Sequence, residues 1–164
     1  MEPWPEPVQR VAAFLRETGA EARLEEFPAG TQTARAAAAA VGCRPEEIVK
    51  SLVFEHDGGS VLALVPGDRR ADPAKIAYSV GAAHARAASP ARVEELTGFP
   101  AGGVAPFLPG RVDRVLIDHR LLIHDRVWVG AGSARHVVGL PPAELVRLTR
   151  GEQVDIAADP EASD

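Results

Sequence analysis

The chain has 164 residues, 46% of them hydrophobic and 25% charged, with a formal net charge of −5 at pH 7. This length predicts one domain that buries its core without disulfide or metal support, and the single cysteine excludes both an internal disulfide and a cysteine-built zinc site. The acidic balance argues against strong non-specific nucleic-acid binding, and no apolar run approaches the roughly 20 residues of a membrane span.

The N-terminal half combines helical spacing with strand-like runs. Its first seven residues contain three prolines and no signal-peptide pattern, so we expect a flexible arm over 1–7 and a cytoplasmic protein. Apolar periodicity, capping residues and glycine stops predict the elements that follow. They are a helix over 8–18, a strand over 22–27, an alanine-rich helix over 34–41 capped from residues 31–33, a helical turn at 45–47, and a hairpin with strands over 49–55 and 61–65.

The C-terminal half continues this alternation of helices and strands. The expected elements are helices over 73–80 and 90–97, a short strand over 84–87, an ordered loop over 99–109, strands over 112–118, 126–129 and 136–140, and a closing helix over 142–148. Hairpins interspersed with helices favour a single α/β domain over 8–157 with a mixed sheet, and a doubly wound nucleotide-binding architecture is the weaker alternative. Residues 158–164 are expected to form a flexible tail.

Lysine is rare in this chain, since 16 of its 18 basic residues are arginine. Lys50 lies in a β-rich run whose alternation places it on the face of Leu52 and Phe54, while Ser51 shares the opposite face with apolar residues. A buried ammonium group is costly, so Lys50 is expected to meet an anion, carbonyl groups or a pocket, unless it reaches solvent from the strand end. The other lysine, Lys75, is expected on the surface of an amphipathic helix.

Two glycine-rich segments could approach a ligand closely. The N–H groups of Gly102-Gly103-Val104 could hold a carbonyl or an oxyanion, although an ordinary tight turn has the same composition. The segment Gly130-Ala131-Gly132-Ser133 lacks the third glycine of a dinucleotide-binding loop. It is therefore either a loop that lines a pocket or a plain turn.

Other catalytic chemistries have weak support. The five histidines show no metal-ligand spacing, so we expect neither a metal nor another cofactor. No nucleophile elbow surrounds Ser133 or any other serine, and no carboxylate–histidine pair is evident as a general base. Cys43 follows a helix end and is expected to be a small buried residue.

The order of these motifs resembles the YbaK/EbsC family of aminoacyl-tRNA deacylases, which is related to the editing insertion of bacterial prolyl-tRNA synthetase. The resemblance covers roughly residues 8–157. It implies an α/β domain around a mixed, barrel-like sheet, and hydrolysis of the ester between a wrong amino acid and the terminal adenosine of tRNA. The motif residues are Thr31, Thr33, Gly42, Lys50, Ser51, Gly67, Gly98, Gly102, Pro106, Asp118, Gly130 and Gly132.

The resemblance also implies roles for individual residues. Lys50 matches the family's essential lysine, and Gly102 and Pro106 match the ends of its GxxxP motif. Gly132, Ser133 and His136 match a loop that helps to select the amino acid. The expected catalytic residues are therefore Lys50 and Gly102, and the expected substrate-binding residues are Thr31, Thr33, Gly103, Val104, Pro106, Gly132, Ser133 and His136.

Several points of mechanism stay open. A substrate hydroxyl could assist the attacking water, and Lys50 could anchor a phosphate, polarise a reacting oxygen or act as the base. Val137 and Leu24 stand where the Cys-tRNA(Pro) branch has aspartate and tyrosine, so Ala, Ser, Thr or Cys are all candidate substrates. The first alternative is a non-catalytic module that binds an amino acid, an acceptor end or a synthetase. The second is a soluble α/β domain with an unrelated small-molecule role, which would have Lys50 pointing into solvent.

The expected partners are the acceptor end of an aminoacyl-tRNA and prolyl-tRNA synthetase, with no membrane and no metal. Because the chain is acidic, its unaided affinity for tRNA should be modest and sensitive to salt. Arginines that could contact an acceptor stem are Arg69, Arg70, Arg86, Arg111 and Arg114.

Overall fold

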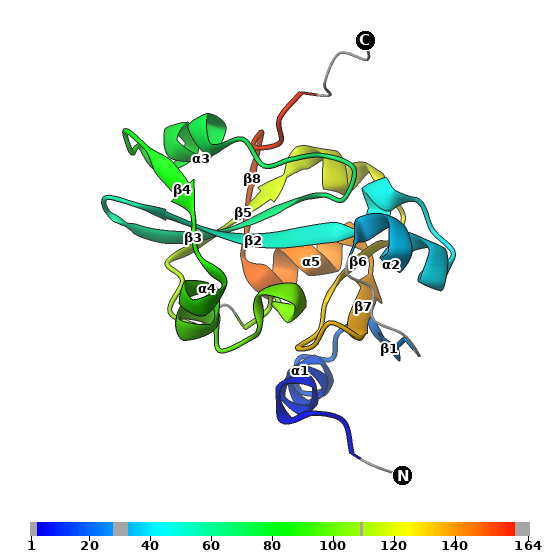
Figure 1. Cartoon of the computed structure of the whole chain (residues 1–164). Coiled ribbons are helices and arrows are strands. Elements are labelled where there is room, and N and C mark those ends of the chain that lie inside the picture. Colours follow the sequence, from blue (N-terminus) through cyan, green and yellow to red (C-terminus); the bar gives the residue numbers. More distant parts are fainter. Residues whose placement is uncertain (1–2, 28–32, 109, 160–164) are drawn as a thin grey trace.

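A five-stranded mixed sheet forms the centre of the protein. The structure is a computed structural model and describes residues 3–27, 33–108 and 110–159. In spatial order, the strands of this sheet are β4 (Ala85–Ala87), β2 (Val49–His56), β3 (Gly59–Pro66), β5 (Arg114–Asp118) and β8 (Glu152–Val154) (Figure 1). β2 and β3 form the predicted antiparallel hairpin, whereas β3, β5 and β8 are parallel neighbours. The predicted mixed sheet is thus confirmed.

A second, antiparallel sheet contains β1 (Arg23–Glu26), β7 (His136–Leu140) and β6 (Val127–Gly130), in that order. An isolated bridge between Ile48 and Trp128 connects it with the start of β2. Within the described residues, the two sheets do not close into one barrel. The α/β fold is as predicted, with two linked sheets in place of the expected barrel-like one.

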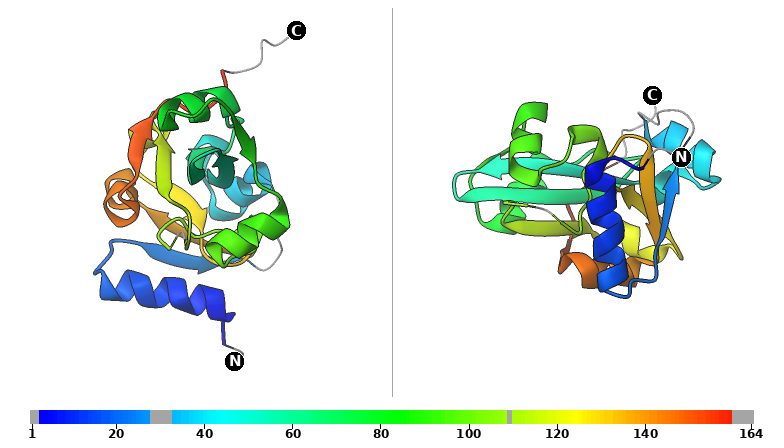
Figure 2. Two further views of the ribbon diagram at one scale, coloured as in Figure 1. Left: turned by 90° about the vertical axis from the view of Figure 1, so that its left-hand side faces the viewer. Right: turned by 90° about the horizontal axis from the view of Figure 1, so that it is seen from below.

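Five α-helices accompany the sheets in the described part of the chain: α1 (Glu6–Glu17), α2 (Ala34–Val41), α3 (Pro73–Val80), α4 (Pro90–Thr97) and α5 (Pro142–Thr149). The side chains of Thr33, Asp72 and Ser89 accept hydrogen bonds from the first-turn N–H groups of α2, α3 and α4. Each of these helices ends at a left-handed glycine, as the sequence predicts. Figure 2 shows α1 running alongside β1 of the small sheet.

Apolar side chains pack against both faces of β2. Val49 and Val53 belong to the larger cluster, which also includes residues of α1 and the small sheet. Phe54, with Leu52 packed against it, belongs to the second cluster, on the other face. The predicted alternation is therefore confirmed. Lys50 is the second residue of this strand, which is covered on both sides.

The structure differs from the sequence-based expectations at several places. Helix α1 begins at Glu6, two residues before the predicted start, and the predicted glycine loop contains a short 3-10 helix, η2 (Ala101–Gly103). The predicted helical turn over 45–47 is confirmed as the 3-10 helix η1 (Pro45–Glu47). A further 3-10 helix, η3 (His119–Ile123), and the strand β8 were not expected. No helix among the described residues is long and apolar enough to cross a membrane.

The C-terminal segment is held by Asp118, which ends β5 and is fully buried. Its Oδ2 accepts hydrogen bonds from the backbone N–H groups of Ile156 and Ala157, at 2.9 and 2.8 Å. The expectation for Lys75 was incomplete, because its ammonium is not simply at the surface. It donates to Asp155 at 3.2 Å and to the carbonyl of Ala157 at 2.9 Å, so it fastens the same segment to α3.

Candidate active site

A cavity of about 580 Å³ opens where the start of β2 meets the end of β6 and the start of β7. Its wall also includes the first turns of α2 and the glycine loop at η2. This volume lies within the usual range for small-molecule sites, about 300–1,000 Å³. The residues that the sequence analysis singled out come from all of these segments.

Lys50, the second residue of β2, lines this cavity. Its Nζ donates a hydrogen bond to the backbone carbonyl of Arg69 at 2.8 Å. Burial lowers the pKa of the Lys50 ammonium. The nearby charge of Arg70 lowers this pKa further, whereas the carboxylate of Asp68 raises it and offsets part of the shift. The lysine thus meets both a carbonyl and a pocket, two of the three surroundings that the sequence predicted.

The loop after β3 brings that carbonyl into place. Gly67 donates its N–H to Ile48 O at 2.7 Å, which ties the loop to the start of β2. A Cβ atom at Gly67 would lie 2.5 Å from Pro45 O and 2.6 Å from Ala34 Cβ. Only glycine allows this close approach, so Gly67 lets the loop pass beneath α2 and present Arg69 O to the lysine.

The glycine loop after α4 forms the opposite wall. Gly102 and Val104 line the cavity, whereas Gly103 and Pro106 are buried behind it. The N–H of Gly103 donates to Pro100 O at 2.8 Å, so this group is already engaged and a carbonyl cradle would have to use its neighbours. The roles assigned to Gly102, Gly103, Val104 and Pro106 remain predictions.

Ser133 and His136 line the cavity from the β6–β7 connection. Ser133 Oγ lies 2.5 Å from His136 Nδ1, and His136 Nε2 lies 2.9 Å from a carboxylate oxygen of Glu26. No carboxylate–histidine pair was evident from the sequence as a general base, and the structure contains one, formed by Glu26 and His136. Sequence spacing could not reveal this pair, because Glu26 lies 110 residues before His136 and meets it only through the pairing of β1 with β7.

The remaining predicted site residues take different positions. Thr33 lines the cavity and also caps α2, accepting a hydrogen bond from Ala36 N at 3.0 Å. Thr31 lies outside the described residues. Gly132 lies behind the wall, where its N–H donates to Gly103 O at 2.8 Å and so joins the two glycine loops.

Ser51 also lines the cavity, although sequence analysis did not assign it a role. Its Oγ is buried and has no hydrogen-bond partner among the described residues. Buried hydroxyl groups are usually paired, so the unpaired Ser51 Oγ is an exception within the described part of the chain. Alternation along β2 could have indicated this position, since Ser51 is the polar exception on the face of Val49 and Val53.

Metal and thiol chemistry find no support in the described part of the chain. No group of three His, Cys, Asp or Glu side chains gathers there as a metal site. Cys43 is half-buried, and burial, followed by the charge of Glu47, raises the pKa of its thiol to about 11. A thiolate nucleophile is therefore disfavoured at this position.

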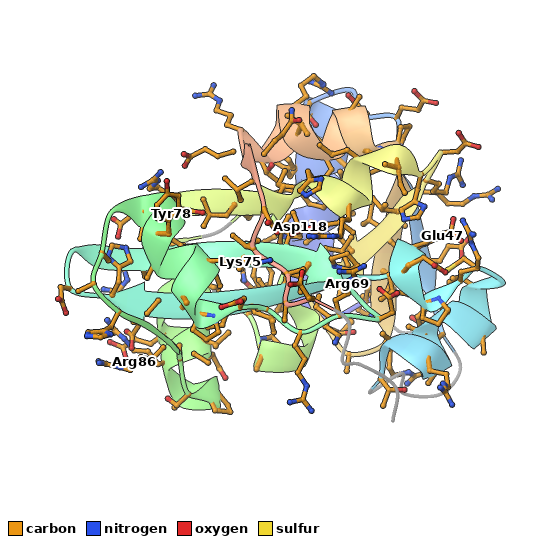
Figure 3. The ribbon with its side chains drawn as sticks, turned by 90° about the horizontal axis from the view of Figure 1, so that it is seen from above. Glu47, Arg69, Lys75, Tyr78, Arg86 and Asp118 are labelled. Carbon is orange, nitrogen blue, oxygen red and sulfur yellow. The ribbon has the colours of Figure 1, made fainter. Side chains whose placement is uncertain are left out.

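The arginines separate into two groups. Arg69 and Arg70 lie near Lys50: the charge of Arg70 lowers the pKa of the Lys50 ammonium, and the backbone carbonyl of Arg69 accepts a hydrogen bond from Lys50 Nζ. Arg86 pairs in register with Glu55, near the far end of β2, and Figure 3 shows it at the opposite end of the molecule from Glu47. The other two are engaged with carboxylates, Arg111 with Glu95 and Arg114 with Glu152.

The fold and the cavity define a small mixed α/β domain with a pocket that is lined by Lys50 and by the two glycine loops. Residues 28–148 match the model of a family described as the aminoacyl-tRNA editing domain. The chain belongs to this family, which confirms the resemblance found in the sequence.

Known proteins of two kinds are similar to the chain. A proline--tRNA ligase of Nitratidesulfovibrio vulgaris is 34% identical over 145 residues, which are 85% of this chain but only 24% of the ligase. A multifunctional Ser/Thr-tRNA deacylase of Escherichia coli, ProXp-y, is 30% identical over 152 residues, 90% of each protein. A crystal structure described as a candidate trans-editing enzyme for prolyl tRNA synthetase superposes with a TM-score of 0.89 at 37% identity, covering 96% of this chain and all of that one.

Proposed function

We propose that this protein is a trans-editing hydrolase that cleaves the ester between a small, wrongly attached amino acid and the terminal adenosine of tRNA. The observation that carries the proposal is the position of Lys50, which lines the cavity and whose Nζ donates a hydrogen bond to Arg69 O. Membership of the editing-domain family and likeness over nine-tenths of ProXp-y support the same reaction class.

Lys50 acts in this proposal as a compact cation rather than as a base. Its Nζ donates to the carbonyl of Arg69, a partner that can only accept. Burial lowers the pKa of the ammonium, and the charge of Asp68 partly offsets that shift. The ammonium keeps N–H groups beyond the one given to Arg69 O, and these can hold the terminal phosphate or stabilise an oxyanion as the ester carbonyl is attacked. A planar guanidinium would place its charge differently.

The attacking water is activated by the 2′- or 3′-hydroxyl of the substrate. His136 is a poor base for this water, because its two ring nitrogens already face Ser133 and Glu26. Gly102 contributes backbone close to the reacting carbonyl, while Val137 and Trp128 give an apolar wall suited to a small side chain.

The proposed setting is the cytoplasm, with prolyl-tRNA synthetase as a partner that delivers mischarged tRNA. The likeness to a proline--tRNA ligase and to a candidate trans-editing enzyme for that synthetase supports this partner. Assistance from a partner also suits an acidic chain, whose own attraction for tRNA is small.

The test is a deacylation screen in which the protein meets tRNAs charged with Ala, Ser, Thr, Cys or Pro. We expect release of at least one small amino acid well above the spontaneous rate. Saturable binding of charged tRNA without release of any amino acid would instead identify a non-catalytic binding module and overturn the proposal.

A further inference from the structure

Glu26, His136 and Ser133 form a chain of polar contacts that ends in the cavity wall. Glu26 and His136 are directly paired across β1 and β7, so their side chains share one face of the small sheet. His136 is only 4% exposed, whereas 41% of the Glu26 side chain is open to solvent. The carboxylate therefore fixes a buried ring from the outer side, and the ring reaches Ser133 on the inner side.

The direction of the hydrogen bonds follows from what each group can donate. A carboxylate only accepts, so the proton of a neutral imidazole lies on Nε2, facing Glu26, and Nδ1 becomes an acceptor. The hydroxyl proton of Ser133 then points to Nδ1, across the 2.5 Å contact. Arg135 N donates to the same Oγ at 3.0 Å.

These bonds leave Ser133 with a defined polarity toward the cavity. A hydroxyl group has one proton and two lone pairs. The proton is given to His136 and one lone pair receives the N–H of Arg135, so what Oγ can still offer is an acceptor. The negative charge of Glu26 behind the ring strengthens this acceptor for a cationic donor.

We infer that Glu26 is a positioning residue, which holds His136 in the Nε2–H tautomer so that Ser133 accepts a hydrogen bond from the α-ammonium group of the aminoacyl ester. The α-ammonium is the strongest donor that such an ester carries in its amino-acid part. The identity of this ligand group rests on the proposed function, whereas the tautomer does not. Glu26 acts through His136 and does not touch the substrate.

The tautomer is tested by NMR of ¹⁵N-histidine-labelled protein at about pH 8.5, where imidazole is ordinarily neutral. We expect the His136 signals of the wild type to show a protonated Nε2 and a bare Nδ1. Glu26→Gln keeps an acceptor oxygen and should keep this tautomer, whereas Glu26→Leu should lose it. A bare Nε2 in the wild type, or an unchanged tautomer in Glu26→Leu, would overturn the inference.

The matched control is Glu25→Leu. Glu25 lies on the same strand and is ion-paired with Arg23 at 3.7 Å, so its replacement removes a carboxylate without touching His136. We expect its His136 spectrum to match that of the wild type. A change as large as that in Glu26→Leu would show that general damage to β1, rather than the loss of one contact, moves the ring.

Ligand recognition is tested with two non-hydrolysable probes, the 3′-alanylamide of 3′-amino-adenosine and its propanoyl counterpart, which lacks only the amino group. We expect the wild type and Glu25→Leu to bind the alanyl probe at least about tenfold more tightly, because a charged hydrogen bond is at stake. Ser133→Ala and Glu26→Leu should lose most of that preference, and Glu26→Gln should keep part of it.

The outcomes separate this inference from the proposed function. Equal binding of the two probes by the wild type would overturn the role of Ser133, even if the protein deacylates tRNA. Failure of both probes to bind would contradict the proposed substrate class, while NMR still decides the tautomer. A covalent acyl-enzyme that disappears in Ser133→Ala would show a nucleophile instead and would also overturn the inference.

Discussion

Gly103 and Ser133 are in backbone contact: a Cβ atom on residue 103 would lie 2.6 Å from Ser133 N and 2.7 Å from Ser133 Cα. The hydrogen bond from Gly132 N to Gly103 O, 2.8 Å long, joins the same two loops. The glycines of the two loops therefore let the GxxxP loop and the β6–β7 connection form one continuous wall of the cavity.

Gly103→Ala should consequently destabilise the protein by about 1–3 kcal/mol, since the added methyl group meets backbone that cannot rotate away. Gly102→Ala is the matched control, because its added Cβ would meet nothing closer than Ala134 Cβ at 3.9 Å. Chemical denaturation should show a change within about 0.5 kcal/mol for that control. Similar losses of unfolding free energy in the two variants would show that the contact between the loops is not the reason why position 103 requires glycine.

The pH dependence of deacylation reports the charge state of Lys50. Burial holds the pKa of its ammonium below the ordinary lysine value of about 10.4. If the cation is the working form, kcat/KM, corrected for spontaneous hydrolysis, falls as pH rises through this lowered pKa. Lys50→Arg keeps its charge, so whatever activity it retains should lack that falling limb. A limb that rises in the wild type and is absent from Lys50→Arg would identify a base instead.

Ser51→Ala should leave the free energy of unfolding unchanged or slightly higher, because its buried Oγ has no partner to lose among the described residues. Thr97→Val provides the contrast, since Thr97 Oγ1 donates to Val93 O at 2.7 Å and accepts from Phe99 N at 3.1 Å. That variant should lose about 1–3 kcal/mol. A loss in Ser51→Ala as large as that in Thr97→Val would show that the Ser51 hydroxyl has a hydrogen-bond partner in the folded protein.

Arg70→Gln should weaken tRNA binding and make it less sensitive to salt, because Arg70 lies within the electrostatic reach of Lys50. One lost phosphate contact lowers the slope of log K against log salt by roughly 0.7–0.9. Arg86→Gln changes the net charge equally, but at the far end of β2. Fluorescence titration should show little effect for this control, and equal effects would mean that overall charge, not position, governs binding.

Local rules predicted the part of the site that depends on a single strand or loop. Alternation along β2 placed Lys50 and Ser51 on opposite faces of a strand buried on both sides, and turn chemistry located the glycine loops. The carbonyl partner of Lys50 could not be predicted in this way. It is a backbone atom of Arg69, and any residue type has a carbonyl.

Pairings between distant strands were beyond the reach of the sequence. Glu26 meets His136 through the register of β1 with β7. Likewise, the polar segment Glu152–Val154 lacks the apolar alternation of a strand, and it becomes β8 because it pairs with β5 and because Asp118 holds the residues that follow. Neither partner is marked by any local pattern.

Removing the charge of Lys50 need not weaken the fold. Because the folded state holds the pKa of Lys50 below its unfolded value, any stability from this group is present only above the unfolded pKa and is lost as pH falls through the folded one. At neutral pH, the ammonium is the form that folding disfavours. Lys50→Met should therefore unfold at the same denaturant concentration as the wild type, or higher, and a loss of activity is then attributable to the site.

The central claim is tested most directly by single-turnover deacylation of the tRNA preferred in the screen, comparing the wild type, Lys50→Met and Lys75→Met. We expect Lys50→Met to be at least about 100-fold slower, as when a charge-stabilising donor is removed from an active site. Lys75→Met, which removes the other lysine of the chain, should retain the wild-type rate. A folded Lys50→Met variant that deacylates as fast as the wild type would contradict the account.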